Sequence, residues 1–127
     1  MDAIKRERIN NKEGWIGVDL DGTLAHFPEG EYDTYKIGRP IPAMVERVKK
    51  WIEDGREVKI FTARAEDHGY DRILLRGAIN SWLVNVAGLP PLNITNEKDK
   101  YCIEIWDDRA VQVKFNEGEP VGGNYIV

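Results

Sequence analysis

The chain has 127 residues, which is enough for one domain with a hydrophobic core and too few for two. Its 42% hydrophobic and 31% charged residues are typical of a globular protein, and no apolar run reaches the length of a membrane span. The net charge of −4 argues against nucleic-acid binding through a broad basic surface, and the single cysteine, Cys102, excludes an intramolecular disulfide and a cysteine-rich zinc site. We therefore expect a cytoplasmic protein of one domain, residues 1–127, with no membrane partner.

The first predicted strand, Gly14–Val18, leads directly into two closely spaced aspartates. The strand delivers Asp19 to the carboxyl edge of the sheet, and Asp21 follows two residues later. Two carboxylates this close repel each other unless a cation or a shared proton lies between them. The segment therefore indicates a metal site, an acid/base pair or both. An ordinary turn is the alternative, because Asp21-Gly22 is a common turn dipeptide.

Two segments beside this strand have less definite patterns. Residues 1–13 are polar and mixed in charge, and the sequence leaves open a short helix, an edge strand or a loosely packed extension. Residues 24–39 contain two glycines and a proline, which favours a loop or a hairpin flap over a helix. Loops of this length often close over a site, and an ordinary surface excursion is the alternative.

The middle of the chain predicts a helix followed by a strand. Apolar residues recur at helical spacing over 41–52, at Ile41, Met44, Val45, Val48, Trp51 and Ile52. Prolines suit the first turn of this helix, and a glycine lies just beyond its end. A strand that begins at Glu57 then ends in polar residues that include Thr62. Because a strand, helix and strand in succession form a parallel pair, Thr62 is expected at the same sheet edge as Asp19.

The second half of the chain predicts a helix over Tyr70–Ala87 and two further strands. The apolar stripe of this helix is expected to consist of Tyr70, Ile73, Leu74, Gly77, Ala78, Trp82, Leu83 and Val86. The strands are predicted at Leu92–Thr95 and Cys102–Trp106, with a polar turn between them. The second of these strands runs into Asp107 and Asp108.

The order of the elements predicts an α/β fold. A short helix at Ala110–Phe115 and a final edge strand at Tyr125–Val127 complete the expected set. The fold is expected to be doubly wound and Rossmann-like, with a mostly parallel sheet of five strands and helices on both faces. Strands end in polar side chains at Asp19, Thr62 and Asp107, so these residues are expected to meet at one edge of the sheet, where such folds bind ligands.

In this arrangement the chain resembles the haloacid dehalogenase-like (HAD) superfamily of phosphohydrolases. The resemblance rests on Asp19-Leu20-Asp21-Gly22-Thr23, on Thr62 after an apolar strand, on the downstream Lys98 and on Asp107-Asp108 after another apolar strand. These four motifs occur in the order that the superfamily has, and they span residues 15–109. The resemblance implies a phosphatase that hydrolyses a phosphomonoester through an aspartyl-phosphate.

The resemblance also implies a role for each residue. Asp19 is the nucleophile, and an ionised carboxylate needs no base to activate it. Asp21 is the general acid/base, and its backbone carbonyl ligates the metal. Thr62 binds a phosphate oxygen, and Lys98 offsets the charge that develops on the phosphoryl group, with Lys100 as the alternative lysine.

Mg²⁺ is the cofactor that the resemblance implies, held by Asp19, Asp21, Asp107 and Asp108. Mg²⁺ prefers oxygen ligands, and the lack of a histidine and cysteine cluster argues against zinc or copper. Asp108 either ligates the ion directly or completes its shell through water. Without the metal, the carboxylates would crowd negative charge where a phosphate must bind.

The partner is expected to be a phosphorylated substrate. Neither interval between the motifs has room for the cap domain of larger members, so the chain is similar to the capless type, whose open sites often accept nucleotides or macromolecules. Asp107-Asp108-Arg109, with Arg39-Pro40-Ile41-Pro42, is also similar to the 3′-phosphatase domain of polynucleotide kinase, which makes a nucleotide or a nucleic-acid end a candidate substrate. The candidate substrate contacts are Ala63, Arg64 and His26, followed by His68 and Arg72. A non-catalytic phosphate- or metal-binding module with the same fold is the rival interpretation.

Overall fold

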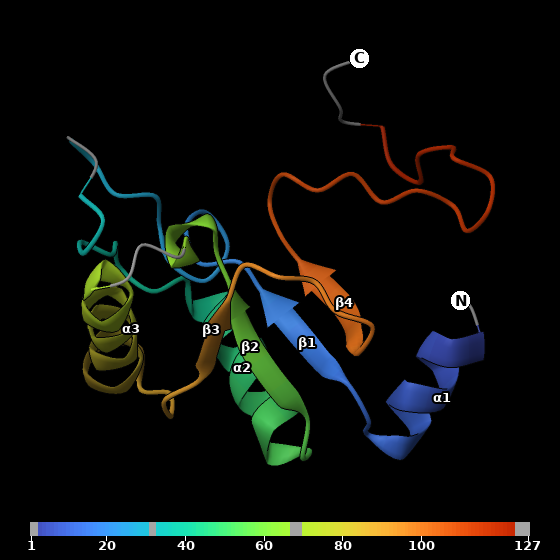
Figure 1. The fold of residues 1–127 in the computed structure, drawn as a ribbon, viewed down its shortest axis with the longest axis horizontal. Coiled ribbons are helices and arrows are strands. Elements are labelled where there is room, and N and C mark those ends of the chain that lie inside the picture. The colour runs from blue at the N-terminus through green and yellow to red at the C-terminus, as the bar shows by residue number, and fades with distance from the viewer. Residues whose placement is uncertain (1–2, 31–32, 67–69, 124–127) are drawn as a thin grey trace.

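The structure, a computed structural model, describes residues 3–30, 33–66 and 70–123. At its centre is a parallel sheet with the strand order β3–β2–β1–β4 (Figure 1). The strands are β1 (Trp15–Val18), β2 (Glu57–Phe61), β3 (Asn93–Thr95) and β4 (Cys102–Trp106). This confirms the α/β class and the predicted parallel strands. The predicted fifth strand, Tyr125–Val127, lies outside the described residues, so the described sheet has four strands and not five.

The helices largely follow the predicted boundaries. They are α1 (Ala3–Asn11), α2 (Pro42–Glu53), the short 3₁₀ turn η1 (Ala63–Ala65), α3 (Tyr70–Trp82) and the π-helical turn η2 (Leu83–Ala87). Residues 1–13 were predicted as a short helix, an edge strand or a loosely packed extension. The structure shows the helix α1 in this segment, and the helix has no buried residue. None of the described helices has the length and apolar character that crossing a membrane requires.

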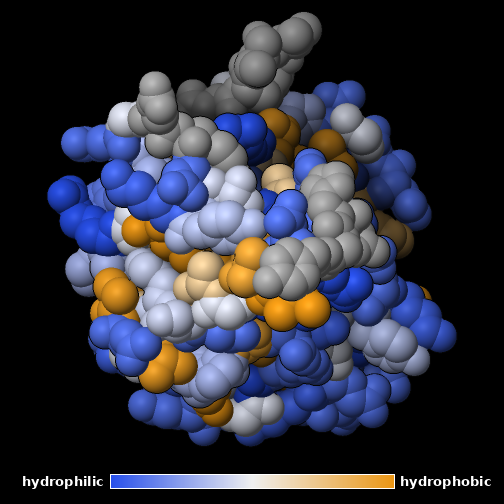
Figure 2. All heavy atoms as spheres, turned by 60° about the vertical axis from the view of Figure 1, so that its left-hand side comes forward, coloured by the Kyte–Doolittle hydropathy of each residue, from blue (hydrophilic) through white to orange (hydrophobic). Residues whose placement is uncertain are grey.

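The buried face of α3 differs from the predicted stripe. The helix and the turn that follows it bury Leu75, Ile79, Trp82 and Leu83. Ile73, Leu74 and Val86 are exposed instead. Apolar residues occupy more than one face of α3, so spacing alone does not identify the face that packs. With the α3 side turned toward the viewer, hydrophobic residues lie between hydrophilic ones (Figure 2).

Both crossover helices cover the same face of the sheet, contrary to the prediction of helices on both faces. Buried residues of α2 and α3, such as Val48 and Ile79, belong to one hydrophobic core together with strand residues. Topology explains this, because right-handed crossovers that move in one direction across a sheet lie on one face. The connection 96–101 passes in front of the other face (Figure 1). Asp99 of this connection accepts a hydrogen bond of 2.9 Å from Nε1 of Trp15.

The segment after β4 also differs from its prediction. Residues 110–115 form no helix, and the chain turns back on itself so that Val113 pairs with Pro120 in an antiparallel bridge. The amide of Lys114 donates to the carbonyl of Glu119 at 2.8 Å. The β-branched residues of this stretch favour the extended backbone that is observed.

The 24–39 segment contains no helix in its described parts, residues 24–30 and 33–39, which agrees with the predicted loop or hairpin. Its two ends pair in an antiparallel bridge between Ala25 and Pro40, and the amide of His26 donates to the carbonyl of Arg39 at 2.8 Å. Nε1 of Trp82 in α3 donates to the carbonyl of Gly38 at 2.9 Å. The base of the loop is therefore held by its own backbone and by α3.

Candidate active site

The polar residues that follow β1 and β4 meet at the point where the chain reverses its direction across the sheet. From β1 the chain moves to β2 and then β3, whereas β4 lies on the other side of β1. The carboxyl ends of β1 and β4 are therefore neighbours, and this position is where open α/β sheets bind ligands. The amide of Asp19 donates to the carbonyl of Trp106 at 2.9 Å. The hydrogen bonding between β1 and β4 therefore continues as far as Asp19.

Three carboxylates gather at this point. One oxygen from each of Asp19, Asp107 and Asp108 lies within 4.8 Å of the others. The hydroxyl of Thr23 lies 3.4 Å from Oδ2 of Asp19 and 3.4 Å from Oδ1 of Asp108. This confirms that the two predicted acidic segments come together, and it adds Thr23 as a residue that links them.

The loop after β1 is shaped so that the acids can approach. Leu20 and Leu24 are fully buried and anchor both sides of the turn. Gly22 between them has a φ of +87°, and a Cβ atom at this position would lie 2.8 Å from Oδ2 of Asp108. A glycine is needed here both for the backbone conformation and for the space that Asp108 occupies.

The surroundings of Asp19 disfavour its charged form. Burial, a hydrogen bond with Asp108 and the negative charge of Asp107 together raise the pKa of Asp19 from its ordinary value of 3.8 to about 7. The amide of Leu20 acts in the opposite direction and lowers it. A cation among the three carboxylates would offset this repulsion.

The donor set fits a hard divalent cation. All three side chains offer carboxylate oxygen, which Mg²⁺ prefers and which does not favour copper or zinc. Asp19 and Asp107 are half-buried and Asp108 is exposed, so the group is open to solvent on one side. Three carboxylates leave room for the waters or the substrate oxygen that Mg²⁺ usually keeps in its shell.

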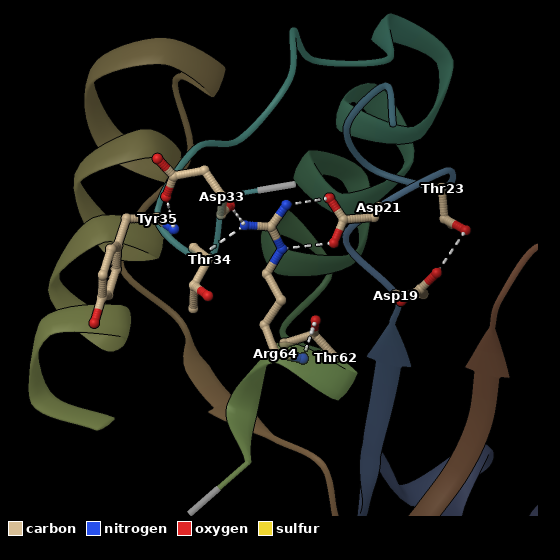
Figure 3. Close-up of polar contacts among 8 residues, drawn as sticks. All are labelled: Asp19, Asp21, Thr23, Asp33, Thr34, Tyr35, Thr62 and Arg64. Atoms are coloured by element: carbon tan, nitrogen blue, oxygen red, sulfur yellow. Dashed lines mark hydrogen bonds and ion pairs between the residues drawn. The ribbon is translucent and has the colours of Figure 1, made fainter. Parts of the chain in front are cut away.

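Asp21 has surroundings unlike those of Asp19. Its carboxylate is held by the guanidinium group of Arg64, with Nε to Oδ2 at 2.7 Å and Nη2 to Oδ1 at 2.8 Å (Figure 3). The side chain of Arg64 is 2% exposed and that of Asp21 is 16% exposed. Nη1 of Arg64 donates to the carbonyls of Asp33 and Thr34 at 3.1 and 2.7 Å. Arg64, predicted as a substrate contact, is thus a buried residue bound to protein groups.

The acid cluster and the Asp21–Arg64 pair line one cleft of about 830 Å³. Thr62 and Ala63, at the end of β2, form part of its wall, and Asn96 forms another part. Thr62 is buried, and its hydroxyl accepts a hydrogen bond of 3.2 Å from the amide of Arg64. Thr62 therefore lies at the same sheet edge as Asp19, as its place after the second strand predicted.

Several other predicted residues lie away from the walls of this cleft. Lys98 is exposed and lines a neighbouring groove, to which Asp107 also contributes. Lys100 lies 5.1 Å from the ring centre of Tyr101. His26 is exposed and is not among the lining residues, whereas Arg72 lies exposed on α3. His68 lies outside the described residues. The part that Lys98 plays stays a prediction.

Three further residues that line the cleft were not among the predicted site residues. Phe27 and Tyr35 come from the 24–39 loop, and Arg109 follows the acidic pair. The hydroxyl of Tyr35 donates to Asp71 of α3 at 3.3 Å, so this side of the cleft joins the loop to the helix. Arg109 was detectable by its position next to Asp108, but no local pattern indicates which loop residues face the cleft.

Comparison of the chain with protein-family models, with curated proteins and with solved structures gave no significant match. Function is therefore inferred from the site and its chemistry.

Proposed function

We propose that the protein is a Mg²⁺-dependent phosphomonoesterase that works through an aspartyl-phosphate on Asp19. The proposal agrees with the resemblance of its motifs to the HAD-like phosphohydrolases of the capless type. Asp19 is the nucleophile and Asp21 is the general acid and base.

One observation carries the proposal: two aspartates on the same loop have different partners. Asp19 lies with Asp107 and Asp108, a group suited to a cation, whereas Asp21 is bound by Arg64 and not by the other acids. Carboxylates with unlike surroundings are suited to different tasks in one reaction. A module that only bound a metal or a phosphate would gain nothing from a second, separately held acid.

The first chemical step transfers the phosphoryl group to the enzyme. An oxygen of Asp19 forms a bond to phosphorus while the bond from phosphorus to the leaving oxygen breaks. Asp21 enters this step in its protonated form and gives the proton to that leaving oxygen, which departs as an alcohol. Asp19, Asp107 and Asp108 would hold Mg²⁺, which would supply positive charge that offsets the negative charge of the acids and of the phosphate.

The second step restores the enzyme. A water molecule gives a proton to Asp21, and its oxygen forms a bond to the phosphorus of the aspartyl-phosphate. The bond between phosphorus and the oxygen of Asp19 breaks, inorganic phosphate leaves, and Asp21 is protonated again for the next cycle. Thr62, a buried residue that lines the cleft, is suited to hold a phosphate oxygen through its hydroxyl or the neighbouring amides.

The test is the hydrolysis of 4-nitrophenyl phosphate with and without Mg²⁺. We expect turnover in Mg²⁺, loss of turnover in excess EDTA and recovery when Mg²⁺ is restored. Asp19→Asn removes the nucleophile and should abolish activity. Asp21→Asn should lower activity by about 10²- to 10⁴-fold on a substrate with a poor leaving group, such as an alkyl phosphate. Asp54→Asn, a change in an exposed residue that follows α2, serves as the control.

Two outcomes contradict the proposal. Full activity in excess EDTA would exclude the metal from the reaction. If wild type and both variants are equally inactive across aryl, alkyl and nucleotide phosphates, the protein is a binding module. If the protein is active, a panel of 3′- and 5′-phosphorylated nucleotides and oligonucleotides identifies its substrate. The same panel tests the narrower proposal of a nucleotide or polynucleotide 3′-phosphatase.

A further inference from the structure

Arg64 is one of two buried polar or charged residues in the described chain, and Thr62 is the other. A buried guanidinium group is costly unless its charge is paired and its N–H groups find acceptors. Here each of its three nitrogens donates, two of them to Asp21 and the third to the carbonyls of Asp33 and Thr34. The group therefore joins two segments, the loop after β1 and the far part of the 24–39 loop (Figure 3).

The contact with Asp21 is of the kind that fixes orientation. Two parallel N–H···O bonds from one planar group hold a carboxylate in a defined plane. Each carboxylate oxygen has two lone pairs, so one on each oxygen stays available to a reacting group. Lysine offers only a single point charge and cannot reproduce this fork.

The contact with the loop is equally specific. The carboxylate of Asp33 accepts a hydrogen bond of 2.8 Å from the amide of Tyr35, and this turn directs the carbonyls of Asp33 and Thr34 toward Nη1 of Arg64. The amide of Lys36 donates to the carbonyl of Asp33 at 3.2 Å. The position of the guanidinium group therefore depends on the turn at 33–36.

We propose that Arg64 is a positioning residue: it orients Asp21 for proton transfer and makes that orientation depend on the turn at Asp33–Lys36. This inference rests on the proposed function of Asp21. It replaces the predicted contact of Arg64 with the substrate by an action through Asp21. The loop thereby influences the chemical step as well as access to the cleft.

Leaving groups of different acidity distinguish positioning from a general structural effect. An alkyl phosphate needs a proton on its leaving oxygen, whereas 4-nitrophenyl phosphate does not. The value of kcat/KM reports the steps up to loss of the leaving group. We expect Arg64→Lys to lower kcat/KM for the alkyl phosphate about tenfold more than for 4-nitrophenyl phosphate. Arg47→Lys, an exposed arginine on α2, is the matched control and should leave both values unchanged.

Two further variants test the connections separately. In the Asp21→Asn background, Arg64→Lys should cause no further loss, because residues that act through one another are not additive. Asp33→Ala removes the acceptor for the amide of Tyr35. It should also lower kcat/KM more for the alkyl phosphate than for 4-nitrophenyl phosphate, by a smaller factor than Arg64→Lys does. Asp33→Asn keeps the acceptor and should resemble wild type. Hydrogen exchange at the amides of Tyr35 and Lys36 should become faster in both Arg64→Lys and Asp33→Ala.

The outcomes separate this inference from the proposed function. If the wild type hydrolyses neither substrate, the proposed function has failed. If the wild type is active but Arg64→Lys lowers kcat/KM for both substrates by the same factor, Arg64 has only a structural role and the inference is overturned. Unchanged exchange at Tyr35 and Lys36 in Arg64→Lys would likewise exclude the dependence on the turn.

Discussion

Asp19 and Asp21, two positions apart in the sequence, have opposite electrostatic surroundings in the folded protein. Asp19 lies beside two other carboxylates, which disfavour its charge, and Asp21 lies against a guanidinium group. Side chains at i and i+2 of an extended segment would point to the same side, but the turn after β1 separates them. The turn that begins at Leu20, between the two aspartates, thus permits two roles for one residue type.

The surroundings of Asp19 predict how stability depends on pH. In the metal-free protein, burial and its acidic neighbours raise the pKa of Asp19 from 3.8 to about 7, so the native state binds this proton more tightly than the unfolded state does. This contribution to the free energy of unfolding is fully present below pH 3.8 and is lost as the pH rises toward 7. In EDTA, the free energy of unfolding of Asp19→Asn should therefore fall less than that of wild type as the pH rises from 3.8 to about 7.

Urea denaturation of both proteins at a series of pH values in EDTA measures this difference. The difference between the two proteins reports the titration of Asp19 together with that of Asp107 and Asp108, because the charges of these three carboxylates interact. Parallel stability curves for wild type and Asp19→Asn would show that Asp19 titrates normally.

Among the elements, the 24–39 loop depends on contacts with distant parts of the chain. Its base is closed by the bridge between Ala25 and Pro40, α3 holds it through Trp82, and its far part is held by Arg64. A loop that is held at three points keeps a defined wall for the cleft. Loops of this length without such contacts have higher mobility.

Trp82→Phe tests the contact between α3 and the loop. The change removes the hydrogen bond to the carbonyl of Gly38 and leaves most of the buried ring volume, so we expect a loss of about 1 kcal/mol in the free energy of unfolding. Hydrogen exchange over residues 24–30 and 33–39 should become faster. Trp51→Phe is the control, because the Trp51 ring packs on Trp106 instead. Equal exchange in the two variants would contradict a specific role for the Trp82 contact.

At the scale of the whole molecule, the candidate metal group joins parts of the chain that are far apart in sequence. Asp19 follows β1, and Asp107 and Asp108 follow β4, which reaches its place beside β1 through the connection 96–101. Because these three carboxylates are brought together only in the folded chain, the cation binds to the native state and not to the unfolded state. Its binding free energy therefore adds to the stability of the native state.

Mg²⁺ is accordingly expected to raise the melting temperature. At a free concentration 100 times its dissociation constant, the ion should add about 2.7 kcal/mol to the free energy of unfolding. Differential scanning fluorimetry across a Mg²⁺ titration measures the shift. Asp107→Asn should reduce it, and Glu53→Gln, at the exposed end of α2, should keep it. A shift of the same size in Asp107→Asn would locate the ion elsewhere.

The elements with local signals could be predicted from the amino-acid sequence. The buried strand β1, the amphipathic helix α2 with a glycine just past its end, and the strands β2 and β4 follow from neighbours a few residues apart. Their order also determined that the acids after β1 and β4 and the threonine after β2 share one sheet edge, because parallel strands all end on the same side. For this reason the group of three aspartates was predictable.

Features that depend on contacts between distant residues could not be predicted from local patterns and are known from the folded structure. The partner of Arg64 lies 43 positions away, and a spacing pattern does not distinguish an arginine that binds a substrate from one that binds Asp21. The buried face of α3, with Leu75 and Ile79 in place of Ile73 and Leu74, was chosen by what the helix packs against. The same holds for the single face that carries both crossover helices. Local patterns restrict what a segment can form, whereas burial and pairing are determined by the rest of the folded chain.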